Sequence, residues 1–216
     1  MGLRRTPLVS GEYYHIYNRG VEKREIFLDK EDYFYFLKLL YICNSKKSIK
    51  LRKIEKNFER GETIVNIGAY CLMPNHFHLL CHEKTENGIS VFMKKLLTAY
   101  AMYFNKKYER NGVLFQGRFK SEHASTDKYL KYLYAYIHLN PAKLKEPKWR
   151  ELKNYNTKDL LNFIKQYPYS SLYEYLNDKI KITNPASFPD YFQNAKDHLD
   201  ELFQWLSAET TQDRPV

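Results

Sequence analysis

The sequence has no apolar run approaching the roughly 20 residues that a membrane-spanning helix needs. Its first residues, MGLRRTPLVSGEYYH, hold no apolar stretch of signal-peptide length. Cysteine is scarce: Cys43, Cys71 and Cys81 are the only 3 in 216 residues, and their spacing is not that of metal-binding pairs. An odd, small number of cysteines is typical of free thiols in a reducing compartment. These absences predict a soluble protein of the cytoplasm, with no membrane segment.

Acidic residues are outnumbered by basic ones, 25 to 35, which gives a net charge of +10 and a pI near 9.3. A balance this basic favours a polyanionic partner. Aromatic residues make up 16% of the chain, with 20 tyrosines. Unpaired bases stack on aromatic rings while Lys and Arg follow the phosphates, so the composition suits single-stranded nucleic acid. A basic protein whose tyrosines only fill the core is the alternative at this point.

Hydrophobic periodicity and turn residues predict the order of the secondary structure. Asp29 is expected to cap a helix, and Pro141 to end one, because proline disfavours helix at the residue before it. The basic segment 44–60 is treated as an insertion, either a helix extension or a loop. We expect strands at 12–18, 63–72, 76–82 and 114–124, helices at 30–43, 88–108 and 126–139, order at 167–176, and a last helix at 188–206. This order predicts an α+β fold with an antiparallel sheet packed against helices.

The strand predicted at 76–82 carries two histidines in an apolar run. Side chains of a strand alternate between faces, so His76 and His78 share one face and the apolar residues between them take the other. Their Cα atoms should lie about 6.6 Å apart, which lets both imidazoles reach one divalent cation. His82 lies roughly 13 Å beyond His78 and is too far. His15, on another strand, stays possible as a ligand, and histidines that are merely exposed or hydrogen-bonded are the alternative.

The helix predicted at 126–139 presents Tyr136 and, one turn later, Asn140. The Asn140 carbonyl oxygen is a suitable ligand for Mg²⁺ or Mn²⁺, and the Tyr136 hydroxyl can act as a covalent nucleophile. An aromatic helix face that only packs is the alternative. At about 100° per residue, the apolar side that should dock on the sheet carries Leu130, Leu133, Tyr134 and Ile137, whereas Tyr129 and Tyr132 fall near Tyr136.

Five segments together resemble one family. They are YYHIYNRG at 13–20, MPNHFHLL at 73–80, LFQGRFKS at 114–121, YIHLNPAK at 136–143 and YPYSS at 167–171. In this order, the set is similar to the HUH-type single-tyrosine transposases of the IS200-like family, in the branch of REP-associated tyrosine transposases. The match spans about residues 12–175.

The resemblance implies a ferredoxin-like α+β fold and a bacterial, DNA-associated protein. A homodimer is a separate expectation. It implies Mg²⁺ or Mn²⁺ held by His76 and His78, with Asn140 as third ligand, and Tyr136 as the nucleophile that leaves a 5′-phosphotyrosine on hairpin-containing single-stranded DNA. Transposases outside this branch have glutamine where Asn140 stands. His138 is a rival ligand, but its position about 200° from Tyr136 predicts that it points away.

Several polar residues are expected to contact the DNA: Arg19, Lys94, Lys95, Gln116, Arg118 and Lys120. The catalytic domain is expected at residues 8–178 and a helical extension with a tail at 179–216. Two other functions fit the same residues. One is a non-catalytic or domesticated single-stranded nucleic-acid-binding protein, and the other is a metal-dependent phosphohydrolase that uses water.

Overall fold

Four antiparallel strands form one sheet in the computed structural model, which describes residues 7–48, 58–151, 155–177, 179 and 181–207. The strands are β1 (Tyr13–Arg19), β2 (Asn66–Met73), β3 (His76–His82) and β4 (Lys120–His123), in the spatial order β2-β3-β1-β4. Two βαβ units thus interleave, because β3 lies between β1 and β2 while β1 lies between β3 and β4. This is the ferredoxin-like arrangement, and it confirms the predicted fold class.

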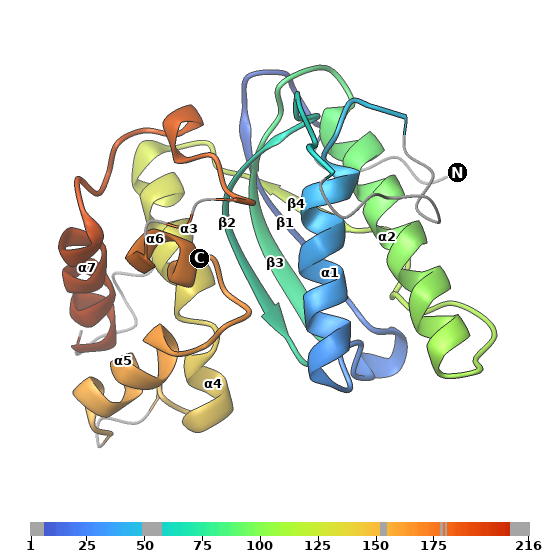
Figure 1. Ribbon diagram of the computed structural model, residues 1–216. Helices are drawn as coiled ribbons and strands as arrows, with labels where there is room; N and C mark the ends of the chain where they lie inside the picture. Colours follow the sequence, from blue (N-terminus) through green and yellow to red (C-terminus); the bar gives the residue numbers. More distant parts are fainter. Residues whose placement is uncertain (1–6, 49–57, 152–154, 178, 180, 208–216) are drawn as a thin grey trace.

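Two helices cover one face of the sheet, α1 (Lys30–Cys43) and α2 (Gly88–Lys107) (Figure 1). Phe77, Leu79 and Cys81 of β3 point into this layer and are fully buried. The opposite face is covered by α3 (Asp127–His138), whose Leu130, Leu133, Tyr134 and Ile137 pack on Ala69 and Leu80. The alternation predicted for β3 is therefore present, and α3 docks on the face that carries the histidines.

A further layer of short helices lies beyond α3 and along the edge of the sheet formed by β2, where the Tyr175 hydroxyl donates to the Gly68 carbonyl (Figure 1). It consists of α4 (Ala142–Lys145), α5 (Thr157–Lys165), α6 (Leu172–Asn177) and α7 (Ala195–Ser207), with the 3-10 turns η1 (Val21–Lys23) and η3 (Pro185–Ser187) elsewhere. Ala135 and Leu139 join Leu160 and Leu202 in a core of their own. Sequence patterns did not predict α4 and α5. Among the described residues, no helix has the length and apolar character needed to span a bilayer.

The strand expected at 114–124 is much shorter in the structure, where β4 begins at Lys120. Gly117 takes a positive φ of 68°, which turns the chain and stops regular pairing. Before it, Phe115 only bridges Gly20, and the Gln116 amide donates to the Arg19 carbonyl. The prediction of one long strand was wrong because a glycine turn divides it.

The helix expected at 188–206 begins later, at Ala195. The Asn194 side chain accepts hydrogen bonds from the Lys196 and Asp197 amides, which is how a residue caps a helix start. Phe192 precedes the helix and stacks on His198, with ring centroids 4.2 Å apart. Most of the basic segment 44–60 lies outside the described residues, and the domain boundary at 178 stays a prediction.

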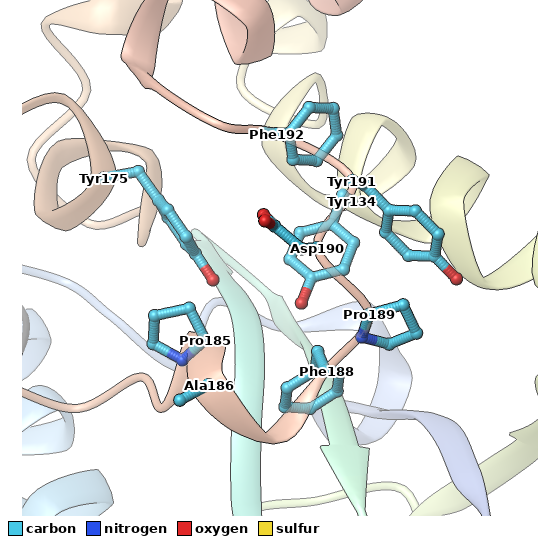
Figure 2. Close-up of a pocket in the computed structure, with 9 residues that line it drawn as sticks. All are labelled: Tyr134, Tyr175, Pro185, Ala186, Phe188, Pro189, Asp190, Tyr191 and Phe192. Carbon is cyan, nitrogen blue, oxygen red and sulfur yellow. The ribbon is translucent and has the colours of Figure 1, made fainter.

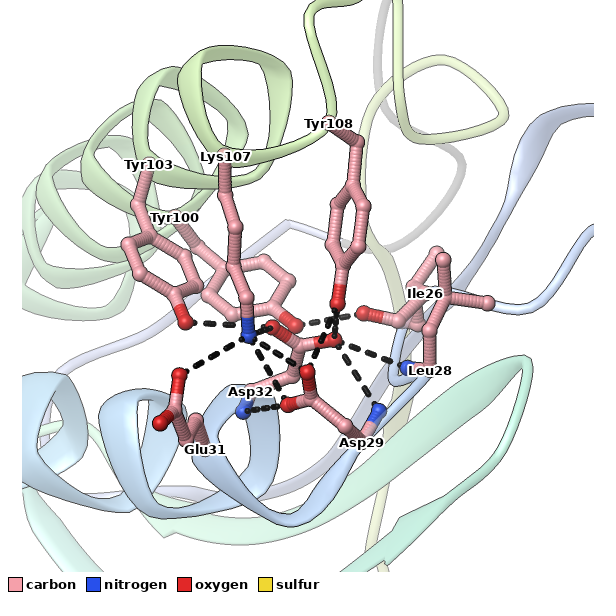
Figure 3. Close-up of polar contacts among 9 residues, drawn as sticks. All are labelled: Ile26, Leu28, Asp29, Glu31, Asp32, Tyr100, Tyr103, Lys107 and Tyr108. Atoms are coloured by element: carbon pink, nitrogen blue, oxygen red, sulfur yellow. Dashed lines mark hydrogen bonds and ion pairs between the residues drawn. The ribbon is translucent and has the colours of Figure 1, made fainter.

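A polar network joins the start of α1 to the end of α2 (Figure 3). Asp29 and Asp32 form a reciprocal cap at the start of α1, as the sequence predicts for Asp29. Lys107 of α2 reaches both carboxylates, at 2.7 Å from Asp29 and 2.9 Å from the buried Asp32. The Tyr108 hydroxyl donates to Asp32 as well, over 2.7 Å. The network fixes these two helices on the face away from the histidines.

Candidate active site

A pocket of about 360 Å³ opens where β1 ends and β3 begins. The face of the sheet covered by α3 forms its floor, since His76 and His78 line it from β3 and Tyr136 lines it from α3. The structure thus brings the predicted nucleophile and two predicted ligands into one cavity. The complete lining is Tyr17, Asn18, Arg19, Lys23, Asn75, His76, His78, Gln116, Lys120, Tyr136 and Lys143.

The tautomer of His76 follows from its neighbour Asn75. The Asn75 amide nitrogen donates to the Lys23 carbonyl, so the amide oxygen is the atom that faces His76. That oxygen lies 2.6 Å from His76 Nδ1, which must therefore donate. Burial, helped by Lys143 and Arg19, lowers the pKa of His76 to about 4. His76 is neutral at pH 7, with the lone pair on Nε2 free to bind a metal.

His78 is 6% exposed and contacts a third histidine, His15 of β1. His15 Nε2 and His78 Nδ1 lie 2.8 Å apart, so the two rings share a hydrogen bond. Burial, and after it the neighbouring His15 and His76, lowers the pKa of His78 well below its usual value. His15 had stayed possible as a metal ligand. Across the described ranges, no group of three or more His, Cys, Asp or Glu side chains is placed to hold a metal.

Tyr136 presents its ring edge-on to both His15 and His78, with centroid separations of 5.5 Å in each case. Burial raises the pKa of its hydroxyl, and Arg150 opposes that rise. The Arg150 guanidinium lies over the Tyr136 ring, 5.2 Å from its centroid. A positive charge beside the phenol stabilises the phenolate that a nucleophilic attack requires.

Asn140 lies at the end of α3, one turn after Tyr136, and is fully buried. Its amide nitrogen donates to the Tyr136 carbonyl over 2.8 Å. The remaining polar atom of the side chain is Oδ1. That oxygen is buried and has no hydrogen-bond partner within the described part of the chain. A buried acceptor without a partner is costly unless a ligand satisfies it. Imidazole nitrogens and an amide oxygen are donors that suit a divalent cation, but Asn140 is not part of the pocket lining that contains His76 and His78.

Four cationic side chains line the pocket: Arg19, Lys23, Lys120 and Lys143. Arg19 is held by a hydrogen bond from its Nε to the Gln116 side chain. Burial, with Arg150 nearby, lowers the pKa of Lys143. The four cationic side chains make the cavity suited to a phosphate group, because Lys and Arg neutralise phosphates. The histidines beside them are neutral.

The family model described as "Transposase IS200 like" matches residues 9–140. The chain belongs to the IS200-like transposase family. A REP-associated tyrosine transposase solved with a REP hairpin has a similar fold, with a TM-score of 0.54, 14% identity, and coverage of 88% of this chain and 96% of that one. The expected family and fold are confirmed.

A second solved structure, a bacterial tRNA(His) guanylyltransferase-like protein in complex with ATP, reaches a TM-score of only 0.39. It is 11% identical and covers 76% of this chain and 74% of that one. Among curated proteins, no sequence matches the transposase significantly.

Three predicted DNA contacts of the transposase lie away from the pocket lining. Lys94 and Lys95 belong to α2, on the opposite face of the sheet, and Lys95 Nζ donates to the Ser45 carbonyl. Arg118 is exposed in the turn before β4. The structure does not bring these three residues to Tyr136, unlike Arg19, Gln116 and Lys120.

Sequence reasoning missed three cationic residues at this site, Lys23, Lys143 and Arg150. Lys23 lies three residues beyond the segment YYHIYNRG, so its spacing could have suggested it. Lys143 lies three residues beyond Asn140, in a segment already singled out, so its spacing could have suggested it. Arg150 had no such signal, because it follows α4 in a part of the chain without clear periodicity.

A second pocket of the transposase, about 340 Å³, has a different character. Figure 2 shows Tyr175 and Pro185 on one side of it, and Tyr191 and Pro189 on the other. Asp190 is the one charged residue in its lining, and that lining includes neither Lys nor Arg. A carboxylate repels phosphate, so the pocket at Tyr136 is the better candidate for a phosphate site.

Proposed function

We propose that this transposase is a metal-dependent endonuclease and strand transferase for single-stranded DNA that contains a hairpin. The single observation that carries the proposal is that Tyr136 shares a cation-lined pocket with His76 and His78. A nucleophile, two neutral imidazoles and several cations in one cavity are the groups that phosphoryl transfer needs.

In the proposed reaction, the scissile phosphate lies among Arg19, Lys120 and Lys143. The Tyr136 oxygen attacks phosphorus and loses its proton to solvent. The bond to the 3′-oxygen breaks, and that oxygen takes up a proton from solvent. DNA is then joined through a 5′-phosphotyrosine, with a free 3′-hydroxyl. Because the new phosphodiester keeps the energy of the old one, a 3′-hydroxyl can displace Tyr136 and rejoin the strands without ATP.

His76, His78 and Asn140 would hold Mg²⁺ or Mn²⁺. Such an ion polarises a phosphoryl oxygen and stabilises the charge that develops in the transition state. The protein's own contribution is a set of nitrogens kept neutral by burial, as the lowered pKa values of both histidines indicate.

Hairpin DNA is the proposed substrate for two reasons. The solved REP-associated transposase of similar fold is bound to a REP hairpin. The basic charge and the many tyrosines of the present chain suit unpaired bases beside phosphates. Whether the protein acts as a homodimer stays a prediction.

The test is to incubate the protein with labelled hairpin DNA and Mn²⁺ and to look for a covalent protein–DNA adduct on a denaturing gel. The wild-type protein should form it, and Tyr136→Phe should not. Tyr132→Phe is the matched control, because Tyr132 lies one turn away on the same helix. Equal adduct in Tyr136→Phe would refute the nucleophile. Cleavage without any adduct would indicate hydrolysis by water, and binding alone would indicate a non-catalytic protein.

A further inference from the structure

A line of three polar side chains crosses the sheet and ends at His78. It starts at Glu122 of β4, continues through His15 of β1 and reaches His78 of β3, so each residue comes from a neighbouring strand. His15 pairs directly with Glu122 in the sheet register. His15 and His78 lie diagonally on the same face and are 4% and 6% exposed.

Glu122 is held as a carboxylate at the outer end of this line. The adjacent His15, followed by the hydrogen bond from Tyr17, lowers the pKa of Glu122 to about 2. The Tyr17 hydroxyl donates to one Glu122 oxygen over 2.7 Å. The other oxygen, Oε2, receives the Tyr129 hydroxyl at 3.4 Å and lies 3.7 Å from His15 Nδ1. Ionised Glu122 can only accept, so its negative charge favours hydrogen on the ring nitrogen that faces it, His15 Nδ1.

The proton positions then follow along the line. A histidine ring whose single hydrogen is on Nδ1 has a lone pair on Nε2. In His15, that lone pair faces His78 Nδ1 at 2.8 Å, and one proton must lie between the two nitrogens. His78 Nδ1 therefore donates, and the lone pair of His78 is on Nε2.

We propose that Glu122 and His15 are positioning residues that fix the ring orientation and tautomer of His78, so that its Nε2 is ready to bind the metal. The inference rests on the proposed function, because the ion is the one assigned to that site. His15 is thus a hydrogen-bond partner of a ligand rather than a ligand itself.

His78 and His76 have the same proposed tautomer, although different residues hold the Nδ1 hydrogen in the two cases. Asn75 holds the Nδ1 hydrogen of His76, as His15 holds that of His78. Both histidines are left with the same free nitrogen, Nε2. Partners of this kind set ligand orientation and basicity at metal sites, and their loss typically costs about 10–100-fold in metal affinity.

The first test needs no metal and no DNA. Nitrogen-15 NMR of the metal-free wild-type protein should show hydrogen on His78 Nδ1 and a bare Nε2. In His15→Phe, the ring keeps its bulk but cannot accept, and His78 should move toward the Nε2–H tautomer. His15→Gln offers an amide oxygen near the position of the lost nitrogen and should restore the wild-type pattern. A wild-type His78 with hydrogen on Nε2 would overturn the proposal.

The second test measures Mn²⁺ affinity by isothermal titration calorimetry. His15→Phe should weaken binding about 10–100-fold, His15→Gln should recover most of it, and Glu122→Gln should lose less than His15→Phe. His82→Phe is the matched control, since His82 is on the same strand but at its far end, hydrogen-bonded to Asn66. Its Mn²⁺ affinity should stay at the wild-type value.

The outcomes separate this proposal from the proposed function. If wild-type protein binds no Mn²⁺, the metal site fails, while the NMR spectra still report on the tautomer of His78. If wild-type protein binds Mn²⁺ and His15→Phe binds it equally well, the positioning role fails and the metal site stands. DNA binding without metal, measured by fluorescence anisotropy, should be the same in all variants.

Discussion

Two pairs of buried histidines lie on either side of α3, and they differ in what surrounds them. In the first, His15 and His78 have ring nitrogens 2.8 Å apart; in the second, His138 and His198 have theirs 2.9 Å apart. Burial lowers the pKa of His78 and of His138 well below the usual value, and that of His198 to about 4. By burial and hydrogen bonding alone, the two pairs look alike.

The two histidine pairs differ in the residues that surround them. The pair at His78 reaches a pocket with Tyr136 and four cationic side chains. The pair at His138 is closed off, because His138 Nε2 bonds to the Ser171 hydroxyl over 2.7 Å and Phe192 stacks on His198. His138 therefore points away from Tyr136, as its helical position predicts. A perturbed histidine becomes a candidate for chemistry only where a ligand can reach it, and elsewhere it holds helices together.

The largest difference should come from removing a histidine on the pocket side. We expect His76→Ala to abolish adduct formation with Mn²⁺, because a proposed metal ligand is lost. DNA binding should fall far less, since phosphate contacts supply most of the affinity. Adduct yield on a denaturing gel and anisotropy of a labelled hairpin measure the two effects. Wild-type adduct levels in His76→Ala would mean that the histidines beside the pocket are not metal ligands.

The opposite result is expected for the pair of His138 and His198, where a substitution should lower stability and leave Mn²⁺ binding unchanged. His138→Ala leaves a cavity and deprives His198 and Ser171 of their partner, so the free energy of unfolding should drop by about 2–4 kcal/mol. Urea unfolding followed by circular dichroism measures this. Mn²⁺ affinity of the folded variant should match the wild type. A variant that folds normally but loses Mn²⁺ would place His138 in the active site instead.

Much of this contrast could be predicted from local sequence. Alternation along β3 separates His76 and His78 from Phe77 and Leu79, and helical spacing sets Tyr136 and His138 on different sides of α3. The expected bounds of α1, 30–43, agree with the structure, and its start follows from the Asp29 cap. Each of these depends only on neighbours within a few positions.

The remaining features depend on contacts between distant parts of the chain. The hydrogen bond between His15 and His78 exists because β1 lies beside β3, and strand order has no local signal. His198 reaches His138 from α7, 60 residues later. The single glycine turn at Gly117 shortens β4, although Arg118, Phe119 and Lys120 after it alternate as in a strand.

The smallest effect we predict is a change in the pH dependence of stability. His138 is kept neutral in the folded protein, whereas an unfolded histidine has a pKa near 6.5. As the pH falls below about 6.5, His138 is protonated in the unfolded chain but stays neutral in the folded protein. The free energy of unfolding therefore decreases as the pH falls. One such histidine should account for about 2 kcal/mol between pH 7 and 5.

His138→Phe removes that contribution and should flatten the stability–pH curve by about this amount, measured by urea unfolding at each pH. His123→Phe is the control, because His123 is partly exposed on β4 and paired with Glu12. Added Mn²⁺ should stabilise the wild type and His138→Phe equally at pH 7, since the proposed metal site includes His78 and not His138. A smaller Mn²⁺ effect in His138→Phe would mean that the two histidine pairs are coupled through α3 rather than independent.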